Sequence, residues 1–495
     1  MKRKLMLINP HPAGRYGEED IRVIVQMPLN LAYIAAHTPR ENWDVDLIDE
    51  TKDPAVDGNG NLTFDADLVG ITALTYQAAR SYLIAQKCRE KGIPVVMGGT
   101  HATTATEEAQ RYVDTVVHGE GEMVWGQLLA DFEKGEMKRL YDGGFPALEY
   151  MKKRPDRNLF KDKYQYRFSS IVTTKGCPWN CEFCSVPLSS GKTYRERDVE
   201  DVLDEMEETS FRGLMFAEDN FYGYMPKSNE RARQLFKRMV ERGIYKDWFG
   251  FTQFSTGQDP VALDYMSKSG CLGFLIGMES TDEQVLRKLR KGSNLKTGVA
   301  NYPIAIKNIH DAGMIVWASV IWGADFQTKD CFKVMTDYIL EHSIDVLTFG
   351  VHCPFPGTPL FKRMVQENRL LRPNFPDDWT YYDTAHLTHT LSHMSFEDFV
   401  EGMQYVYDNI YGAENLRNRF VKTLKANGSR RTAMFAYKVG SDWDKVFRQV
   451  LDNLYKLQES GLYERTMRER GLTWTSDITP RPAPAPPVTQ IQIAS

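Results

Sequence analysis

Short apolar runs and helix-like segments alternate along this chain in two successive series. In the first series, five runs have the length and composition of strands, at Lys4–Ile8, Val45–Ile48, Leu68–Thr72, Pro94–Met97 and Thr115–Val117. Among these runs, three segments have apolar residues at helical spacing, at Leu29–His37, Gln77–Lys91 and Met123–Phe132. This alternation predicts a doubly wound, Rossmann-like parallel sheet, which binds ligands beyond the carboxyl ends of its strands.

The alternation restarts after a polar connector. Six more strands are expected, at Ile171–Thr174, Leu214–Ala217, Phe249–Phe254, Gly273–Met278, Ile315–Ile321 and Val346–Val351. Six strand–helix units are too few for an eight-stranded barrel, so they predict a partial (β/α)6 barrel of the TIM type. Its active site is expected at the carboxyl ends of the strands.

The two series predict an α/β protein with several domains, since 495 residues exceed one ordinary core. The predicted division is residues 1–140 for the Rossmann-like domain, 141–168 for a linker, 169–375 for the barrel, 376–475 for a helical C-terminal region and 476–495 for a tail. The tail is rich in Pro and Ala and is predicted to be disordered.

The charge and composition of the chain argue against nucleic-acid binding and against insertion into a membrane. The net charge is −5, and no basic cluster alternates with aromatic residues, so a nucleic-acid partner is not expected. No run of 18 apolar residues and no signal-peptide pattern occurs. The chain is therefore expected to be soluble and cytoplasmic, without a transmembrane segment.

Three of the seven cysteines lie within eight residues, at Cys177, Cys181 and Cys184. Thiolates are soft ligands that suit iron–sulfur clusters or zinc. A closed structural zinc site needs four ligands, and no fourth Cys or His is near in the sequence. Three cysteines would fill three corners of a cubane cluster and leave one iron open for catalysis. A zinc knuckle and a chance grouping are the alternatives.

The spacing Cys-x3-Cys-x2-Cys, with Phe183 before the last cysteine, resembles the signature of the radical S-adenosylmethionine superfamily. The resemblance implies a 4Fe-4S cluster whose open iron chelates the amino and carboxylate groups of S-adenosylmethionine. One electron, from a donor such as flavodoxin or ferredoxin, then yields a 5′-deoxyadenosyl radical that abstracts hydrogen from a substrate.

Residues at the ends of later barrel strands match the superfamily pattern in order. Glu218 and Asp219 resemble the position that contacts the amino group of S-adenosylmethionine, although Asp219 also suits a helix N-cap. Glu279 is expected to bind the ribose hydroxyls or the substrate. Gln253 is a cofactor-binding candidate by its position alone.

The N-terminal domain resembles the cobalamin-binding domain that precedes many radical S-adenosylmethionine barrels. The matching elements are Pro28–Ala35, Leu68–Thr72, Val96–His101 and Val117–Glu122. The resemblance makes cofactor-binding candidates of Thr72, Thr75, Gly98, Gly99, Thr100, His101, Gly119, Glu120 and Gly121. Plain turn chemistry for the glycines and a structural hydrogen bond for His101 are the alternatives.

The sequence departs from cobalamin proteins that ligate cobalt through histidine, because it lacks their Asp-x-His-x-x-Gly element. If cobalamin binds, no protein histidine is then expected on its lower face. The loop at Thr72–Tyr76 is expected to face the cobalt instead.

The resemblance favours a cobalamin-dependent radical methyltransferase that acts on an unactivated carbon. Its small-molecule substrate is left open among lipids, tetrapyrroles and natural-product precursors, and the catalytic residues are left unassigned. The alternatives are a cyclase or rearrangement enzyme with the same cofactors, a radical enzyme that has lost cobalamin, and a non-catalytic cluster or zinc protein.

Overall fold

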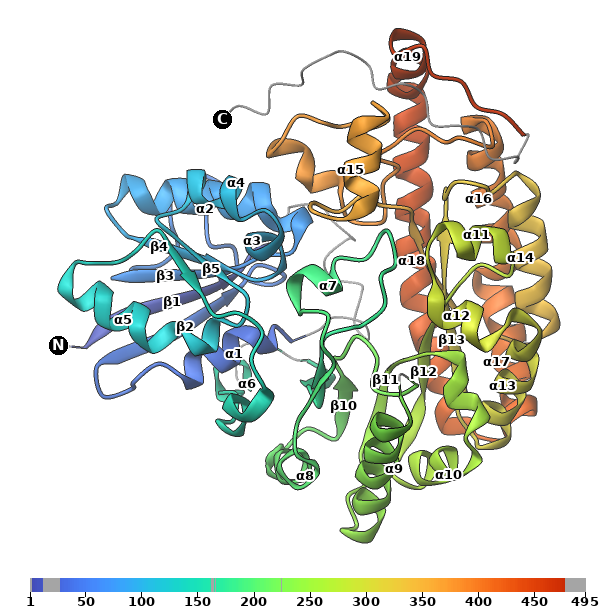
Figure 1. The fold of residues 1–495 in the computed structure, drawn as a ribbon, viewed down its shortest axis with the longest axis horizontal. Helices are drawn as coiled ribbons and strands as arrows, with labels where there is room; N and C mark the ends of the chain where they lie inside the picture. The colour runs from blue at the N-terminus through green and yellow to red at the C-terminus, as the bar shows by residue number, and fades with distance from the viewer. Residues whose placement is uncertain (1, 12–26, 162–163, 165, 224, 477–495) are drawn as a thin grey trace.

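The computed structural model describes residues 2–11, 27–161, 164, 166–223 and 225–476. It contains two six-stranded parallel sheets with helices against them, and a mostly helical region at the C-terminus (Figure 1). The predicted fold class is confirmed. Apart from Ser476, the tail predicted to be disordered lies outside the described residues. No helix among those described is long and apolar enough to cross a membrane.

The first sheet has the strand order β2-β1-β3-β4-β5-β6. Its strands are β1 (Arg3–Asn9), β2 (Trp43–Asp49), β3 (Leu68–Thr72), β4 (Val95–Gly98), β5 (Thr115–His118) and β6 (Leu140–Asp142). The order reverses between β1 and β3. In doubly wound sheets this switch point opens the crevice that binds ligands.

Helices cover both faces of this sheet because their apolar residues form single stripes. Ala78, Tyr82, Ala85 and Cys88 of α2 recur every three or four residues and are all buried. They pack with α4 on one face, whereas α1 and α5 pack on the other. The helices are α1 (Leu29–Ala36), α2 (Ala78–Glu90), α3 (Thr100–Thr104), α4 (Thr106–Tyr112) and α5 (Trp125–Lys134).

The second sheet has the order β14-β13-β12-β11-β10-β7, all parallel, as in a partial barrel. Its strands are β7 (Phe168–Ile171), β10 (Gly213–Phe216), β11 (Asp247–Thr252), β12 (Cys271–Glu279), β13 (Ile315–Trp322) and β14 (Val346–Val351). The prediction of the first strand was shifted. Residues Thr174–Lys175 form a separate strand, β8, which pairs antiparallel with β9 (Arg195–Glu196).

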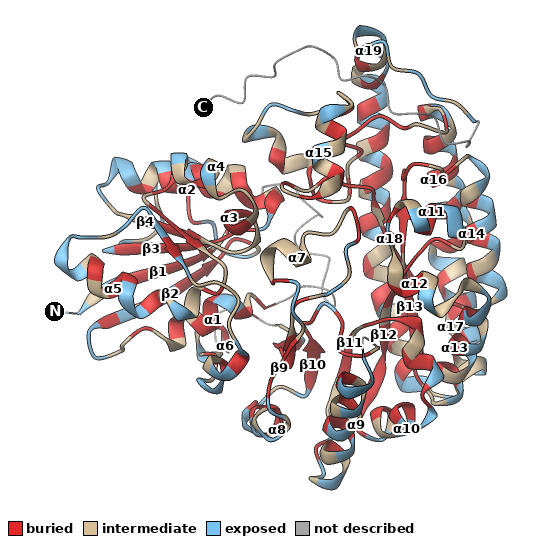
Figure 2. Cartoon of the chain, in the orientation of Figure 1, coloured by how far each residue is buried: buried red, intermediate tan, exposed pale blue. Residues whose placement is uncertain are grey.

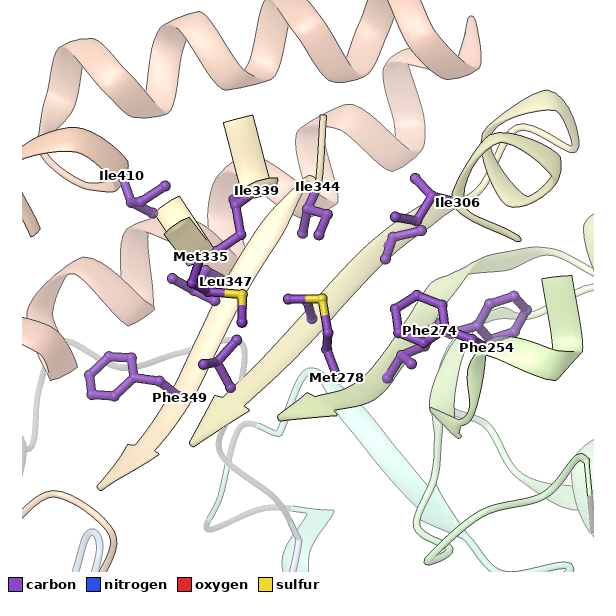
Figure 3. Packing of buried hydrophobic residues seen from close by; sticks show 14 of the residues in the cluster. Phe254, Phe274, Met278, Ile306, Met335, Ile339, Ile344, Leu347, Phe349 and Ile410 are labelled. Atoms are coloured by element: carbon purple, nitrogen blue, oxygen red, sulfur yellow. The ribbon is translucent and has the colours of Figure 1, made fainter. Parts of the chain in front are cut away.

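Helices line the outer face of the barrel sheet and bury its largest apolar core. Figure 2 shows the strands mostly buried and the outer helices exposed on one side. In Figure 3, Met335 and Ile339 of α14 pack beside Leu347 and Phe349 of β14. The outer helices are α8 (Val199–Glu208), α9 (Pro226–Glu241), α10 (Pro260–Lys268), α13 (Tyr302–Asp311), α14 (Asp330–Glu341) and α16 (Phe396–Ile410).

The long C-terminal helix α18 (Arg430–Glu459) fills the inner face of the barrel. Phe435, Ala436 and Val439 pack on residues from all six strands, including Phe168 of β7 and Val346 of β14. Near the start of α18, the Arg431 guanidinium donates to Asp247, the first residue of β11. The helix therefore starts at the amino ends of the strands and runs toward their carboxyl ends. Helices α17 (Ala413–Asn427) and α19 (Leu462–Glu469) flank it in the chain.

Candidate functional site

The cysteine trio lies on the loop between β8 and the short helix α7 (Val186–Ser189), beyond the carboxyl end of β7. Gly176 opens this loop with a φ of +87°, and a Cβ there would stand 2.3 Å from the carbonyl oxygen of Thr193. Only glycine fits such a position. The tight turn brings Cys177, Cys181 and Cys184 within electrostatic range of one another.

Burial and one nearby lysine set the charge of these thiols. Burial raises the pKa of Cys184 to about 12 and raises that of Cys181 as well. Lys291 acts in the opposite sense on both thiols, and its ammonium donates to the Glu279 carboxylate at 2.7 Å. The predicted residue Glu279 is therefore next to the cysteine loop, where it anchors Lys291.

Three cysteines on one short loop supply, as thiolates, the donor set that a cubane cluster requires. Among the residues that the structure describes, no three His, Cys, Asp or Glu side chains are close enough to hold a single metal ion. A cubane makes a different demand, because each cysteine binds a different iron. The loop fits that demand by its donor chemistry.

The two predicted acidic residues after β10 have different surroundings. Both oxygens of the Glu218 carboxylate are engaged, by the backbone N–H of Thr173 at 2.7 Å and by the hydroxyl of Thr174. Asp219 accepts from the backbone of Gly176 and is an exposed residue, yet desolvation by the protein around it raises its pKa to about 6. Because Gly176 directly precedes Cys177, this hydrogen bond places the exposed Asp219 carboxylate beside the cysteine loop.

Gln253 lies just past β11 beside unpartnered polar atoms. Among the described residues, neither its side-chain oxygen nor the hydroxyl of Ser255 has a hydrogen-bond partner, and both are buried. Both side chains pack against Gly223, where a Cβ would collide with them. Buried polar groups are normally paired, so these two are available to a ligand.

A cavity of about 690 Å³ lies between the two sheets, at the carboxyl ends of both. The switch-point strands contribute Asn9 and Thr72 to its lining, and the loop after β3 contributes Leu74. Leu74 is 47% exposed although it is apolar, because it faces this cavity. From the barrel half of the chain come Ser170, Val172, Lys175, Ala217, Trp443 and Val446.

A smaller cavity of about 180 Å³ adjoins the large one inside the first domain. Apolar side chains such as Ile71, Val96 and Val117 form much of its wall. Six predicted cofactor residues line it as well: Thr72, Gly98, Gly99, Thr100, Gly119 and Gly121. At Gly99, φ is +91° and a Cβ would lie 2.8 Å from the Thr72 hydroxyl, so the close approach of β3 and β4 requires glycine there.

Glu120 also lines the small cavity, but its carboxylate is engaged across the domain boundary. Lys175 donates to it at 2.5 Å, Arg195 at 2.9 Å and the Tyr150 hydroxyl at 2.8 Å. The pKa of Glu120 falls despite its burial, since Lys175 and Arg195 stabilise the ionised form. Lys175 directly precedes Gly176, so this cluster, here called the interdomain latch, ties the first domain to the cysteine loop.

Two of the residues predicted to bind cobalamin are absent from the linings of both cavities. Among the described residues, His101 lines neither cavity: it is fully buried, with its Nε2 3.1 Å from the buried Tyr82 hydroxyl and 3.3 Å from the partly buried Glu108. Thr75 is buried in the turn after β3, beside lining residues but not among them. For His101, the structure favours the structural alternative.

Several lining residues carry no signal in the sequence. Trp443 and Val446 are far along the chain, and helical spacing gives only their place in a helix. Glu122 lines both cavities, and burial raises its pKa. It lies within Val117–Glu122, one of the segments that resemble the cobalamin-binding domain. That position in the sequence could have identified it as a lining residue.

Comparisons with known proteins agree with this layout. The family models that match are the B12 binding domain over residues 25–129, the radical SAM superfamily over residues 171–339 and a domain of unknown function, DUF4070, over residues 358–457.

Curated relatives match most of the chain. The bacteriochlorophyllide d C-12(1)-methyltransferase of Chlorobaculum tepidum is 29% identical over 80% of this chain and 85% of its own length. The hopanoid C-2 methylase of Rhodopseudomonas palustris is 25% identical, over 74% and 71%. The methyltransferase TsrM from Kitasatospora setae, solved with cobalamin and a 4Fe-4S cluster, superposes with a TM-score of 0.61 at 16% identity. That superposition covers 91% of this chain and 99% of TsrM and shows a shared fold.

Proposed function

Because this chain belongs to the radical S-adenosylmethionine enzymes that carry a B12-binding domain, we propose that it methylates an unactivated carbon of a bulky, largely apolar small molecule. One observation carries the proposal. The cavity of about 690 Å³ is lined both by the first domain and by the barrel with its inner helix. A substrate there is within reach of groups held by either domain.

The cofactors of this chemistry are a 4Fe-4S cluster, S-adenosylmethionine and cobalamin. Cys177, Cys181 and Cys184 would hold the cluster, and Asp219 would pair with the ammonium group of S-adenosylmethionine. Bound together, these groups supply hydrogen abstraction from the substrate and a methyl group to replace the hydrogen. Within the chain, the interdomain latch would fix the distance between the two halves of the site.

Leu74 would face the lower side of cobalamin. It is exposed to the large cavity from the loop after β3, which is the loop expected to take the place of a histidine ligand. An apolar side chain there would exclude water from the cobalt without coordinating it. The smaller cavity, walled in part by Ile71, Val96 and Val117, would hold the base of the nucleotide tail.

Gly98 offers a test of that tail site. Its φ is not in the left-handed region, and an added Cβ would lie 3.9 Å from Val117, so larger side chains fit the backbone but fill the small cavity. We expect Gly98→Val to weaken cobalamin binding about tenfold or more, as the loss of about 1.4 kcal/mol would do. Cobinamide, which lacks the nucleotide tail, should bind with unchanged affinity. Equilibrium dialysis measures both, and Gly126→Val, on an open helix surface, is the control.

The walls of the large cavity indicate the substrate class. Among the described lining residues, Glu122 is the only acidic one, and Lys175 is the only lysine or arginine. Met151, Val172 and Trp443 present apolar surface to the cavity. Such a lining favours a ring system with few polar groups. The molecules in the names of the two curated relatives are a bacteriochlorophyllide and a hopanoid, and both are ring systems.

Asp219 and Glu218 form a matched pair for testing S-adenosylmethionine binding. Asp219→Asn removes the carboxylate charge. It should reduce the free energy of S-adenosylmethionine binding by about 1.5–3 kcal/mol, the value of a charged hydrogen bond, and so weaken binding roughly 10–100-fold. Glu218→Gln should leave the affinity within a few-fold, because its carboxylate braces Thr173 and Thr174. Calorimetric titration of both reconstituted variants gives the comparison. The reverse ranking would contradict the assignment.

Product analysis tests the proposed reaction. The anaerobically reconstituted protein is given cobalamin, S-adenosylmethionine, a reductant and candidate ring substrates. A methyltransferase should form S-adenosylhomocysteine and 5′-deoxyadenosine in equal amounts, with one methylated product for each pair. 5′-Deoxyadenosine with a product of unchanged carbon number would instead indicate a cyclase or rearrangement enzyme. Cluster loading without either product, for every substrate, would favour a non-catalytic protein.

A further inference from the structure

We propose that the segment Arg287–Lys291 is the docking surface for an acidic one-electron carrier protein. This basic turn has the sequence Arg-Lys-Leu-Arg-Lys, in a chain whose net charge is −5. It begins at the end of α11 (Glu283–Lys288) and leads into α12 (Gly292–Thr297). The inference rests on the proposed function, because that chemistry consumes one electron delivered to the cluster.

The basic turn is in direct contact with the cysteine loop. The backbone N–H of Glu182, next to Cys181, donates to the carbonyl of Leu289 at 3.1 Å. On the inner side of the turn, Leu289 is buried in the cluster against which Phe183 packs. Lys291 lies over the Phe183 ring, 5.9 Å from its centroid. This surface therefore adjoins the three predicted cluster ligands through one layer of residues.

The outer side of the turn carries exposed positive charge, chiefly that of Arg290. Lys291 is paired with Glu279, and Arg287 with Glu283 at 2.9 Å. Among the described residues, no carboxylate lies within ion-pair distance of Arg290, which is exposed, or of Lys288, which is partly exposed. The Lys288 ammonium lies 5.6 Å from the centroid of the Phe326 ring and interacts electrostatically with Glu182. Exposed charge of one sign attracts a partner of the opposite sign and accelerates its encounter.

Electron transfer slows steeply with distance, so a donor must dock where the cluster is nearest the surface. In the transfer, the carrier's reduced flavin or iron–sulfur group loses one electron and the cluster gains it. No proton moves and no bond changes. The carrier then leaves in its oxidised form.

The test compares two reductants on the cluster-loaded full chain without substrate. Reduced flavodoxin is the acidic carrier, and photoreduced 5-deazariboflavin is a small neutral reductant. Stopped-flow absorbance follows reduction of the cluster. For Lys288→Glu with Arg290→Glu, we expect the rate with flavodoxin at low salt to fall about tenfold or more. The rate with deazariboflavin should stay unchanged.

Two exposed lysines on the outer helices, changed by Lys307→Glu with Lys333→Glu, alter the net charge equally and should leave both rates unchanged. For the wild-type chain, added salt should slow reduction by flavodoxin and not by deazariboflavin. Docking at the basic turn is overturned if flavodoxin reduces the double variant at the wild-type rate, or if salt has no effect. A wild-type chain that holds no cluster would instead refute the proposed function.

Discussion

Cys181→Ala should remove the iron–sulfur cluster and with it all formation of 5′-deoxyadenosine. Cys177, Cys181 and Cys184 share one loop, and two thiolates cannot replace three around a cubane. The loss should exceed the roughly 10–100-fold effect that is typical when an outer partner of a metal ligand is changed. Iron and sulfide content of the anaerobically reconstituted protein gives the first readout, and mass spectrometry of the nucleoside product the second.

Cys331→Ala is the matched control for this loss. Cys331 is half-buried in α14, away from the cysteine loop, so its removal should change neither iron content nor product. A similar thermal midpoint in the two apoproteins would show that the Cys181 variant still folds. Stoichiometric iron and normal product in Cys181→Ala would refute the ligand assignment.

Local periodicity made the two sheets predictable. A buried parallel strand is a short apolar run, and an amphipathic helix has a three-to-four spacing, so each element is specified by its own residues. The start of the barrel was misplaced because the strand-forming run Ile171–Thr174 follows Ser169 and Ser170, which carry no strand signal although both pair in β7. Pairing with β10 ends β7 at Ile171, and antiparallel pairing with β9 assigns Thr174 to the separate strand β8.

Other elements depend on distant partners and carry no local signal. Strand β6 has three residues, two of them exposed, and exists because it pairs with β5. Strand β6 also crosses the predicted boundary at residue 140, between the first domain and the linker. The exact position of that boundary stays a prediction. The placement of α18 inside the barrel follows from the unfilled inner face of a six-stranded sheet, which no window of α18 reveals.

The candidate site shows the same division. The cysteine spacing and the loops at strand ends were visible in the sequence because they are local patterns. The role of each carboxylate was not visible, since it depends on which donors the fold brings near. Thr173 and Thr174 occupy both oxygens of Glu218, whereas Asp219 is exposed and accepts from the backbone of Gly176 beside the cysteine loop. Sequence alone cannot rank two adjacent acids of this kind.

Glu120→Ala should destabilise the apoprotein by about 3–5 kcal/mol, the usual cost when one partner of a buried ion pair is removed. The substitution leaves Arg195, only 7% exposed at its side chain, and Lys175 without their carboxylate. Denaturant unfolding of the apoprotein measures the effect. Asp311→Ala, which breaks an exposed pair with Lys307, should cost no more than about 0.5 kcal/mol.

The result in apoprotein separates two roles for Glu120. A residue that served only to bind cofactor would leave the stability of the cofactor-free chain unchanged, whereas a latch between domains would not. The pH dependence of the unfolding free energy gives a second test of the latch. Because the folded pKa of Glu120 is lowered, its stabilisation is complete above the ordinary glutamate pKa of about 4.3 and is lost as pH falls through the folded value. The stability gap between wild type and Glu120→Ala should therefore narrow in acid, and a gap that widens there would contradict the latch.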